Sequence, residues 1–435
     1  MKLLIILAQY HPALNPNVYR WRAIANHWIA QGHEVHVLCT KRSGLPDETA
    51  FEGVQVHRAG QNSLLDWAYN LLHAKRRRGE SGGDLPARHG VLRKGLEKLV
   101  DATWRSLYWP DGRCLWYWPG RKRALKLLQT DTFNGIITVG APFTAHLIGL
   151  ACKRAQPELP WLVDIEDPFA FVDAYFINNR LLYRRLNFHA EALVLNAATA
   201  ITVTVDTAKE AYEHYFPGIG SKITVVPPLF DPTLVMAPGS DLFDSRCIHI
   251  AYFGAFYAPI RTPDAALNLL DLLLERYPEL KDRLLIHFFG EIEYAVKAAF
   301  DRYPRLLPNL RLHGLVEREQ VASAMAQTTF LLNIGNTTTY NLPSKSADYL
   351  ASGKPIIHLS ASEPDTFVAF MAEHPMMLRI NTQTIGPEAA DALGKFIADF
   401  QNQHLSAEAI AIRIKSYQTA PIADAYFRLL EKMNF

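Results

Sequence analysis

The sequence predicts an α/β protein of two doubly wound, Rossmann-like domains, each built around a parallel sheet. Short apolar or β-branched runs alternate with amphipathic helical stretches through the first half of the chain. The same alternation starts again after Pro227-Pro228 and a polar stretch at residues 238–240. At 435 residues the chain is long enough for two domains of about 150 to 200 residues each.

Apolar runs in the first half are the predicted strands of the first sheet. Strands of a parallel sheet are buried on both faces, so runs that stay apolar without alternation are typical of them. Amphipathic helices separate these runs, and the helix predicted at residues 18–30 ends at Gly32. The predicted strands are residues 2–7, 34–39, 55–57, 135–139, 161–165, 200–203 and 223–226.

In the second half, predicted strands end directly in glycines. Residues 248–253, 284–289 and 310–313 are apolar runs that lead into Gly254, Gly290 and Gly314 respectively. A glycine at the end of a strand lets the backbone approach a ligand closely. Ligands of doubly wound sheets bind at the carboxyl ends of the strands, so these turns are candidate contacts. A helix is predicted between the first two strands, at residues 263–276.

A βαβ unit follows these strands. It consists of a strand at residues 330–334, a polar loop at 335–339, a helix at 344–352 and a strand at 356–359. Gly353 and Pro355 stop the helix. The chain ends in a helix-rich segment at residues 407–434.

The start of the helix at 344–352 carries candidate binding chemistry. Ser344 and Lys345 open the helix, where free backbone N–H groups and a lysine charge favour an anion such as phosphate. Asp348 follows one turn later and offers a carboxylate to sugar hydroxyls. A basic start with an acidic second turn suits a nucleotide sugar. The alternative is ordinary helix capping.

Residues 340–355 resemble the donor-site segment of retaining glycosyltransferases with the GT-B fold, the family-4 group also called glycosyltransferase group 1. The resemblance implies two domains that face a central cleft. Residues 1–235 would form the acceptor-side domain and residues 236–410 the nucleotide-sugar domain. Residues 411–435 would form a helix that crosses back to the first domain.

The resemblance also implies roles for individual residues. In the family two glutamates eight positions apart bracket this helix, and here these positions hold Tyr340 and Asp348. Asp348 would hold the ribose hydroxyls. Tyr340 is not a carboxylate, but its hydroxyl and neighbouring Asn341 can hydrogen-bond the transferred sugar.

Similar family contacts are expected near the glycine turns. After Gly254 the family has an arginine, which Ala255 replaces, so Arg261 and Lys345 are the expected diphosphate pair. The turn at Gly314 resembles the one whose backbone holds the nucleobase. Uridine is the favoured base, and guanosine is the alternative.

The first domain offers candidates on the acceptor side. Asn15 lies in the loop after the first predicted strand, and Arg22 lies on the following helix, where both can contact a phosphate or the acceptor. Arg22 can equally form a surface salt bridge. Glu166 and Asp167 end a predicted strand and are the candidate catalytic acids, with solvated loop acids as the alternative. His146 is interpreted as a packed histidine on a helix.

Residues 75–126 combine basic and aromatic side chains. Such a mixture favours docking to an anionic membrane surface, with nucleic acid binding and a plain solvated insertion as rivals. The nearly balanced net charge of +2 argues against nucleic acid as a partner. No run is long and apolar enough for a transmembrane helix, so any membrane contact is expected to be peripheral.

Cysteines and histidines show no zinc-like spacing, and no metal or cofactor is expected. Cys39, Cys114, Cys152 and Cys247 are scattered and indicate reduced thiols in a cytoplasmic protein, with disulfides as the alternative. The basic and aromatic segment 75–126 predicts that this protein lies at the inner face of the membrane.

The predicted function is metal-independent, retaining transfer of a sugar from a nucleotide diphosphate sugar, with a UDP-sugar favoured. The expected acceptor is a hydroxyl of a glycan or lipid-linked acceptor in surface polysaccharide or glycolipid synthesis. One alternative is a non-catalytic assembly partner that binds nucleotide or glycan. The other is a nucleotide-sugar epimerase.

Overall fold

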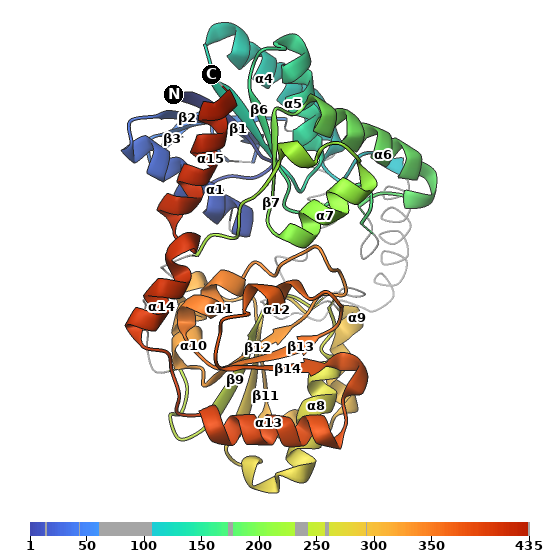
Figure 1. Ribbon diagram of the computed structural model, residues 1–435, viewed down its shortest axis with the longest axis vertical. Helices are drawn as coiled ribbons and strands as arrows, with labels where there is room; N and C mark the ends of the chain where they lie inside the picture. The colour runs from blue at the N-terminus through green and yellow to red at the C-terminus, as the bar shows by residue number, and fades with distance from the viewer. Residues whose placement is uncertain are drawn as a thin grey trace, which may run out of the picture. The chain divides into compact units, whose positions relative to one another are not determined.

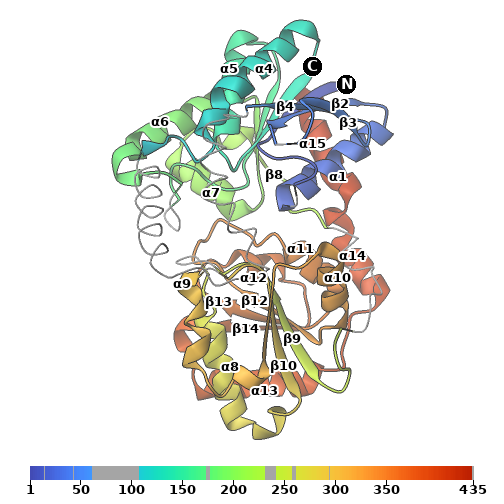
Figure 2. The same ribbon diagram turned by 180° about the vertical axis from the view of Figure 1, so that it is seen from behind.

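The chain forms two compact units, each built around its own sheet (Figure 1, Figure 2). The computed structural model describes residues 1–13, 15–42, 44–60, 107–172, 177–230, 242–256, 261–292 and 294–433. The first unit comprises Met1–Val203, Tyr212–Val225 and Ala423–Phe435, and the second comprises Thr204–Ala211 and Val226–Ile422. The division thus falls near residue 226, against a predicted boundary at 235. The segment that joins the first unit at the end of the chain begins at Ala423.

The first sheet has eight strands in the order β3-β4-β2-β1-β5-β6-β7-β8. All pairs are parallel except β3 with β4, which is antiparallel at the sheet edge. β1 lies in the interior and is flanked by β2 and β5, and its apolar side chains are buried on both faces. The strands are β1 (Lys2–Ile6), β2 (Glu34–Thr40), β3 (Glu48–Phe51), β4 (Val54–Ala59), β5 (Gly135–Val139), β6 (Trp161–Asp164), β7 (Ala200–Val203) and β8 (Ile223–Val225).

Helices cover both faces of the first sheet. α1 packs against α15. The ring centroids of Trp21 and Tyr426 lie 5.0 Å apart, and Trp28 Nε1 donates to Ala423 O at 3.2 Å. α4 packs on α5, which packs on α6. The bounds are α1 (Pro16–Ala30), α4 (Tyr117–Thr130), α5 (Thr144–Ala155), α6 (Arg180–Ala197), α7 (Asp206–Tyr215) and α15 (Thr419–Met433).

The second sheet is fully parallel, with the order β11-β10-β9-β12-β13-β14. Alternate residues of β9 serve opposite faces: Ile250 and Tyr252 pack in one apolar layer, and Ala251 and Phe253 pack in the other. This two-sided burial explains why the strand sequences are apolar throughout. The strands are β9 (Ile248–Phe253), β10 (Leu284–Phe289), β11 (Leu310–Gly314), β12 (Phe330–Ile334), β13 (Ile356–Ser360) and β14 (Met377–Asn381).

The two layers of the second unit contain different helices. Leucines of α8 and Phe396 of α13 pack in the layer of Ile250, whereas α10, α11 and α14 contribute to the layer of Phe253. The bounds are α8 (Asp264–Arg276), α9 (Tyr294–Lys297), α10 (Arg318–Gln327), α11 (Ser346–Ser352), α12 (Thr366–Phe370), α13 (Pro387–Phe400) and α14 (Ala407–Ile414).

The predicted fold class is confirmed, with small corrections. The predicted strands are present within one or two residues at most ends, and β3 and β14 were not predicted. The helix predicted to begin at Ser344 begins at Ser346, because Lys345 occupies the cap position. The prediction that His146 packs within a helix is confirmed, since it is buried in α5.

Several other predictions meet the structure only in part. All four cysteines are free; Cys39 and Cys152 are buried, and Cys114 and Cys247 are half-buried. Of the basic and aromatic segment 75–126, residues 75–106 lie outside the described residues, and 107–126 lead into and begin α4. Within the described ranges, the helices are all too short or too polar to cross a membrane.

Candidate functional site

The carboxyl edge of the second sheet contains a switch point between β9 and β12. From β9 the chain builds β10 and β11 on one side, then returns to build β12, β13 and β14 on the other. The loops after β9 and β12 therefore diverge at the switch point, which is the place where doubly wound sheets bind ligands. The predicted donor residues lie in the turns and helices that follow these strands.

Three glycine turns lie close together at the carboxyl edge of the second sheet. Gly254 N donates to Phe289 O at 2.9 Å, and Gly290 N donates to Gly314 O at 2.8 Å, so the turns after β9, β10 and β11 are joined. A Cβ on Gly290 would lie 2.2 Å from Gly254 O. Gly290 and Gly314 have φ values of +133° and +69°, which favour glycine. The predicted contacts Gly254 and Gly314 therefore lie on one close-packed backbone surface.

Tyr349 fixes α11 at the switch point. Its buried hydroxyl donates to Leu332 O of β12 at 3.1 Å and accepts from Phe253 N of β9 at 3.2 Å. Both switch-point strands thus hold the same helix. Gly353 closes the helix in the left-handed conformation, with φ +65°.

Lys345 and Asp348 form a charged pair at the start of α11. Lys345 Nζ lies 3.5 Å from Asp348 Oδ2, and the Asp348 side chain is 6% exposed. Burial raises the pKa of Asp348 to about 6, although the charges of Lys345 and Arg318 lower it. Burial also lowers the pKa of Lys345, which the Asp348 carboxylate opposes. The pair can present both an anion-binding ammonium and a hydroxyl-binding carboxylate.

Arg318 is a member of this charged group that the sequence analysis missed. It is the first residue of α10, and its charge acts on both Lys345 and Asp348. The available signal was a basic residue at a helix start shortly after the Gly314 turn. Basic helix starts are common, so this signal is weak on its own.

Arg261 lies at the same edge of the sheet. Its Nη1 donates to Tyr252 Oη at 3.0 Å, and its Nη2 donates to Asn336 Oδ1 in the loop after β12. Its Nε is buried without a hydrogen-bond partner among the described residues. The guanidinium is therefore held between the ends of β9 and β12.

The loop from β12 to α11 contains the other predicted donor contacts. Tyr340 and Asn341 are half-buried, and Asn341 Oδ1 accepts from Thr338 Oγ1 at 3.1 Å. Ser344 is exposed and precedes the helix, so its predicted place inside the helix start was wrong. Ser346 opens the helix instead, and its Oγ donates to Pro343 O at 2.7 Å.

The first unit contains a cavity of about 440 Å³. The switch point of the first sheet lies between β1 and β5, and the cavity is lined by the loops after β1, β5 and β6 together with α5 and α6. The predicted residues Asn15 and Asp167 both line it. Asp167 is exposed, whereas stacked Phe143 and Phe169 form an apolar wall, with ring centroids 3.9 Å apart.

Asn15 and Arg22 both have structural partners. Asn15 Oδ1 caps α1 by accepting from Val18 N at 3.0 Å, and its Nδ2 donates to Gln9 Oε1 at 2.7 Å. Arg22 forms an ion pair with Glu52, the surface salt bridge that the sequence left open. Arg22 is not among the cavity-lining residues, so the structure does not bring it together with Asn15 and Asp167.

Glu166 lies beside a buried polar network rather than in the cavity lining. Asp164 Oδ1 accepts from Tyr426 Oη at 2.7 Å, and Tyr426 Oη accepts from Arg20 Nη2 at 2.9 Å. Burial and the charge of Asp164 raise the pKa of Glu166 well above its usual range, while Arg20 opposes the rise. Burial therefore makes Glu166 a weaker acid than an exposed glutamate.

Buried ionisable residues around the cavity were not predicted from sequence as part of a site. Asp111 accepts from Thr144 N and Oγ1, and Glu191 accepts from Ala170 N at 2.7 Å and from Tyr212 Oη at 2.7 Å. Burial raises the pKa of Glu191 to about 7. His146 also lines the cavity, and burial lowers its pKa to about 3, so the ring is neutral. Asp111 and Glu191 gave no motif.

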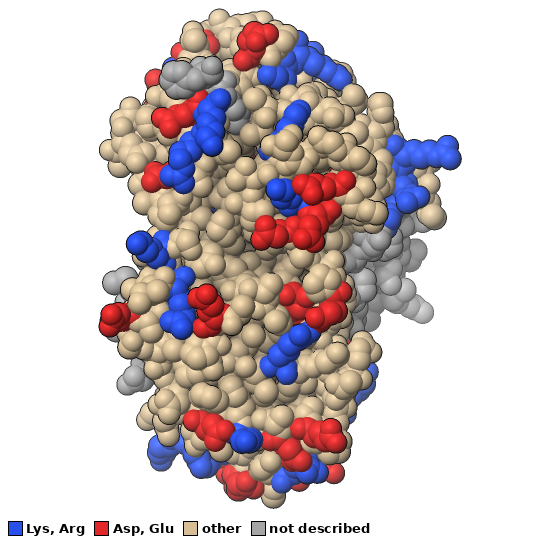
Figure 3. All heavy atoms as spheres, viewed as in Figure 1, with Lys and Arg blue, Asp and Glu red and all other residues tan. Residues whose placement is uncertain are grey.

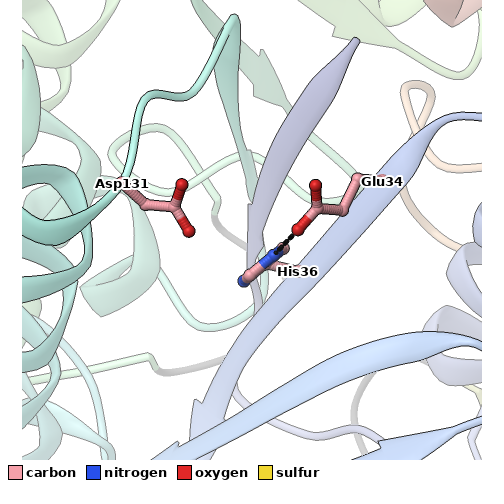
Figure 4. Close-up of side chains that lie close together, drawn as sticks. All are labelled: Glu34, His36 and Asp131. Carbon is pink, nitrogen blue, oxygen red and sulfur yellow. Dashed lines mark hydrogen bonds and ion pairs between the residues drawn. The ribbon is translucent and has the colours of Figure 1, made fainter.

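A cluster of Glu34, His36 and Asp131 has the ligand types of a metal site (Figure 4). His36 Nε2 lies 2.8 Å from Glu34 Oε1. The Lys2 ammonium lies 2.8 Å from Glu34 and also pairs with Asp131, so it already supplies the positive charge that a cation would bring. Lys2 and Glu34 begin β1 and β2, at the edge of the sheet opposite the cavity. The cluster therefore serves as an ion-pair network.

Comparison with solved structures identifies the architecture. The chain is similar to sucrose-phosphate synthase from Thermosynechococcus elongatus, with a TM-score of 0.66 and 14% identity over 99% of this chain and 98% of that one. It is similar to HepE from Anabaena in complex with UDP, with a TM-score of 0.61 and 11% identity over 99% and 100% of the two chains. It is also similar to WaaG, a glycosyltransferase involved in lipopolysaccharide biosynthesis, with a TM-score of 0.58 and 11% identity over 99% and 98%.

These similarities show that the chain has the GT-B fold, as the sequence predicted. No protein-family model matches the sequence, and no curated protein matches it significantly.

Proposed function

We propose that this GT-B chain is a glycosyltransferase that moves a sugar from a nucleotide diphosphate sugar to an acceptor hydroxyl. The observation that carries the proposal is the charged group of Lys345, Asp348 and Arg318 at the switch point of the second sheet. The bound UDP of the HepE structure, on the same fold, supports a UDP-sugar as the donor.

In this proposal the second unit binds the donor. Arg261 and Lys345 bind the diphosphate, with Arg318 adding positive charge, and Asp348 accepts hydrogen bonds from the ribose hydroxyls. The glycine turns at Gly254 and Gly314 allow close backbone approach. α11 has only seven residues, so these side-chain charges contribute more to anion binding than its dipole does.

The proposed transfer retains the anomeric configuration and needs no metal ion. The leaving diphosphate develops negative charge in the transition state, and preorganised cations stabilise such charge. Arg261, hydrogen-bonded to Tyr252 and Asn336, and Lys345, at the start of α11, would supply two positive charges. Tyr340 and Asn341, in the loop that leads to α11, would hydrogen-bond the transferred sugar.

The cavity of the first unit is the proposed acceptor site. Its exposed Asp167 carboxylate would orient the attacking hydroxyl or accept its proton. Asn15 also lines the cavity, and Glu166 lies next to Asp167 after β6, where burial raises its pKa. We propose a glycan or lipid-linked acceptor in surface polysaccharide or glycolipid synthesis, and WaaG's part in lipopolysaccharide biosynthesis supports this class.

We propose a cytoplasmic location with peripheral attachment to the anionic inner face of the membrane. Free cysteines are typical of a reducing compartment. In the described part of segment 75–126, the Trp118 side chain is 68% exposed beside exposed Lys122. Exposed tryptophan next to basic side chains suits a membrane interface.

A second candidate is a non-catalytic protein that binds a nucleotide sugar and assists assembly. Tyr340 stands where the resembling family has a glutamate, and Ala255 stands where it has an arginine. These are the positions expected to touch the transferred sugar and the diphosphate. A protein that kept Asp348 and Lys345 would still bind nucleotide.

A binding and turnover experiment separates these candidates. UDP and UDP-sugars should raise the melting temperature of the purified chain more than UMP or uridine does. Slow release of UDP and free sugar from a UDP-sugar, even without acceptor, indicates a transferase. Binding without release favours the non-catalytic candidate, and absence of stabilisation by any nucleoside diphosphate or its sugar rejects both. Conversion of one UDP-sugar into another without release of UDP would indicate an epimerase.

A further inference from the structure

A second hollow in the first unit is larger and more apolar than the proposed acceptor cavity. It is a groove of about 840 Å³ formed by α4, α5, α6 and the segment 109–114. Pockets of about 300 to 1,000 Å³ are the size that binds small organic ligands. The proposed function does not use this groove.

Large apolar side chains line the groove and remain open to solvent. Trp118 is 68% exposed, Leu186 41% and Leu193 38%. Leu186 and Leu193 lie seven residues apart on α6, and Ala190 lies between them, so they form one stripe along the helix. Contiguous exposed apolar surface of this kind marks a binding site for an apolar partner.

The charge around the groove is of one sign. Its lining contains Arg121, Arg154 and His189, and no acidic residue is among the described residues that line it. Neither arginine forms an ion pair with a carboxylate in the described part of the chain, whereas Arg123 on the same helix pairs with Glu48. Arg180, Arg184 and Arg185 lie in the first two turns of α6, and basic side chains are exposed at that end of the helix (Figure 3). Arginines without an acidic partner among the described residues, beside an apolar groove, complement an anionic, phosphate-bearing amphiphile.

The groove and the acceptor cavity share their walls. Glu191 and Val194 of α6 line the cavity, while Ala190 and Leu193 of the same two turns line the groove. The segment before α4 is divided in the same way, because Asp111 and Arg113 line the cavity and Pro110 and Cys114 line the groove. The two hollows are therefore neighbours on opposite sides of the same elements.

We propose that this groove holds the hydrocarbon chain of a lipid phosphate or diphosphate that carries the acceptor sugar. Arg121 and Arg154 bind the phosphate, and the sugar lies at the neighbouring cavity. The assignment of the lipid-linked sugar as an acceptor rests on the proposed transferase function. The binding of an anionic isoprenoid or acyl chain in the groove does not.

The test uses the full-length chain with farnesyl phosphate and farnesol as probes, each below its micellar concentration, monitored by tryptophan fluorescence. The groove variant is Leu186→Glu with Leu193→Glu, and the charge variant is Arg121→Glu with Arg154→Glu. The matched control is Leu307→Glu with Ile412→Glu, which changes exposed apolar residues of the second unit. Circular dichroism and melting temperature report whether each variant folds.

The groove variant should bind both probes at least tenfold more weakly than the control does. The charge variant should lose at least tenfold affinity for farnesyl phosphate and keep its affinity for farnesol, because only the former is anionic. All variants should keep their stabilisation by UDP, since the donor residues lie in the other unit.

Wild-type protein that binds neither probe, or a groove variant that binds as well as the control, overturns the proposal. Binding to anionic vesicles without binding of monomeric farnesyl phosphate also overturns it and assigns the surface to a bilayer instead. A groove variant that loses stability while wild type binds no probe means that the chain itself fills the groove. Farnesyl phosphate binding together with failure of UDP to bind rejects the transferase function and leaves the groove assignment intact.

Discussion

Lys345 and Arg261 are the residues on which the donor proposal depends most directly. Replacing either by alanine should weaken UDP binding by about 1.5 to 3 kcal/mol, the range for hydrogen bonds to charged groups. Uridine should bind nearly as before, because it lacks the diphosphate. Isothermal titration of both ligands checks this, and Lys395→Ala, which changes an exposed lysine of α13, is the control. Equal losses for uridine and UDP would indicate damaged folding instead.

Asp348 should make donor binding pH-dependent. Burial raises its pKa to about 6, so the carboxylate is protonated in a growing fraction of molecules as the pH falls from 7 to 5. The protonated group accepts ribose hydroxyls less well, and the affinity for UDP-glucose should fall by up to about tenfold over this range. UDP-glucose is the suitable probe because its phosphates do not titrate there.

The Asp348→Asn variant is the control for this pH dependence. It should bind UDP-glucose weakly at every pH and show no change between pH 5 and 7. It should also lose more affinity for UDP than for a 2′,3′-dideoxy analogue, which has no ribose hydroxyls to donate. Affinity that keeps its full pH dependence in the variant would assign the titration to another group.

Some of the candidate site residues were predicted from the sequence, and there are physical reasons why the others were missed. Lys345 and Asp348 were found because they lie three residues apart in one recognisable segment. Arg318, Asp111 and Glu191 were missed because each reaches its site from a different element, and only the fold brings them together. Arg22 lies on α1 and pairs with Glu52 in the turn between β3 and β4, which is the surface salt bridge that the sequence had left as the alternative.

α11 shows how one element positions the donor residues. Tyr349→Phe should leave Phe253 N buried without its acceptor, which costs about 1 to 3 kcal/mol. The urea midpoint of the second unit should fall, and UDP binding should weaken because α11 is no longer tied to both β9 and β12. Tyr277→Phe removes only a 3.3 Å bond to half-exposed Asp391 and should change neither quantity. Unchanged stability of Tyr349→Phe would show that packing alone holds the helix.

α6 carries a buried acid whose titration should affect the stability of the first unit. Burial raises the pKa of Glu191 from 4.5 to about 7. The folded chain therefore binds the proton more tightly than the unfolded chain does. Its contribution to stability is complete below pH 4.5 and is lost as the pH rises to 7, by up to roughly 3 kcal/mol.

Urea unfolding of the first unit at pH 5 and pH 7.5 measures this contribution. Glu191→Gln should reduce the difference between the two midpoints. It also lowers stability at both pH values, because one amide oxygen cannot replace the two carboxylate oxygens that accept from Phe169 N, Ala170 N and Tyr212 Oη. A pH difference equal to that of wild type would contradict the assignment to Glu191.

Elements with strong apolar runs were predictable, and edge elements were not. β9, β10 and β12 match the predicted residues because strands buried on both faces are apolar at every position. β3 and β14 lie at sheet edges, where one side of the strand is unpaired and the sequence is mixed, so their signal is weak. The start of α11 moved because Lys345 takes the cap position that serine was expected to hold.

For the whole molecule, the division into two units was predicted from the repeated strand and helix pattern, whereas the return of the chain end to the first unit was expected only from the family resemblance. α15 begins in sequence belonging to the second unit and, from Ala423, belongs to the first. Its Tyr426 completes the Arg20–Asp164 network beside Glu166. No local pattern in the last residues predicts that contact, because Arg20 and Asp164 lie more than 200 positions earlier in the sequence.

The last prediction concerns attachment of the whole chain to membranes. If the segment 75–126 docks to an anionic surface, vesicle binding should increase with the anionic lipid fraction and fall with salt. Each basic group near the surface contributes about 1 kcal/mol, and salt screens it beyond about 10 Å at 0.1 M. Arg76, Arg77 and Arg78 lie outside the described residues, so this prediction rests on sequence. Replacing all three by glutamate should release the chain from vesicles in a flotation assay and leave UDP binding unchanged.

The matched control replaces Arg276, Arg302 and Arg305, which lie in exposed ion pairs of the second unit. Equal binding to neutral and anionic vesicles, or none to either, would reject membrane docking and make nucleic acid the next ligand to test.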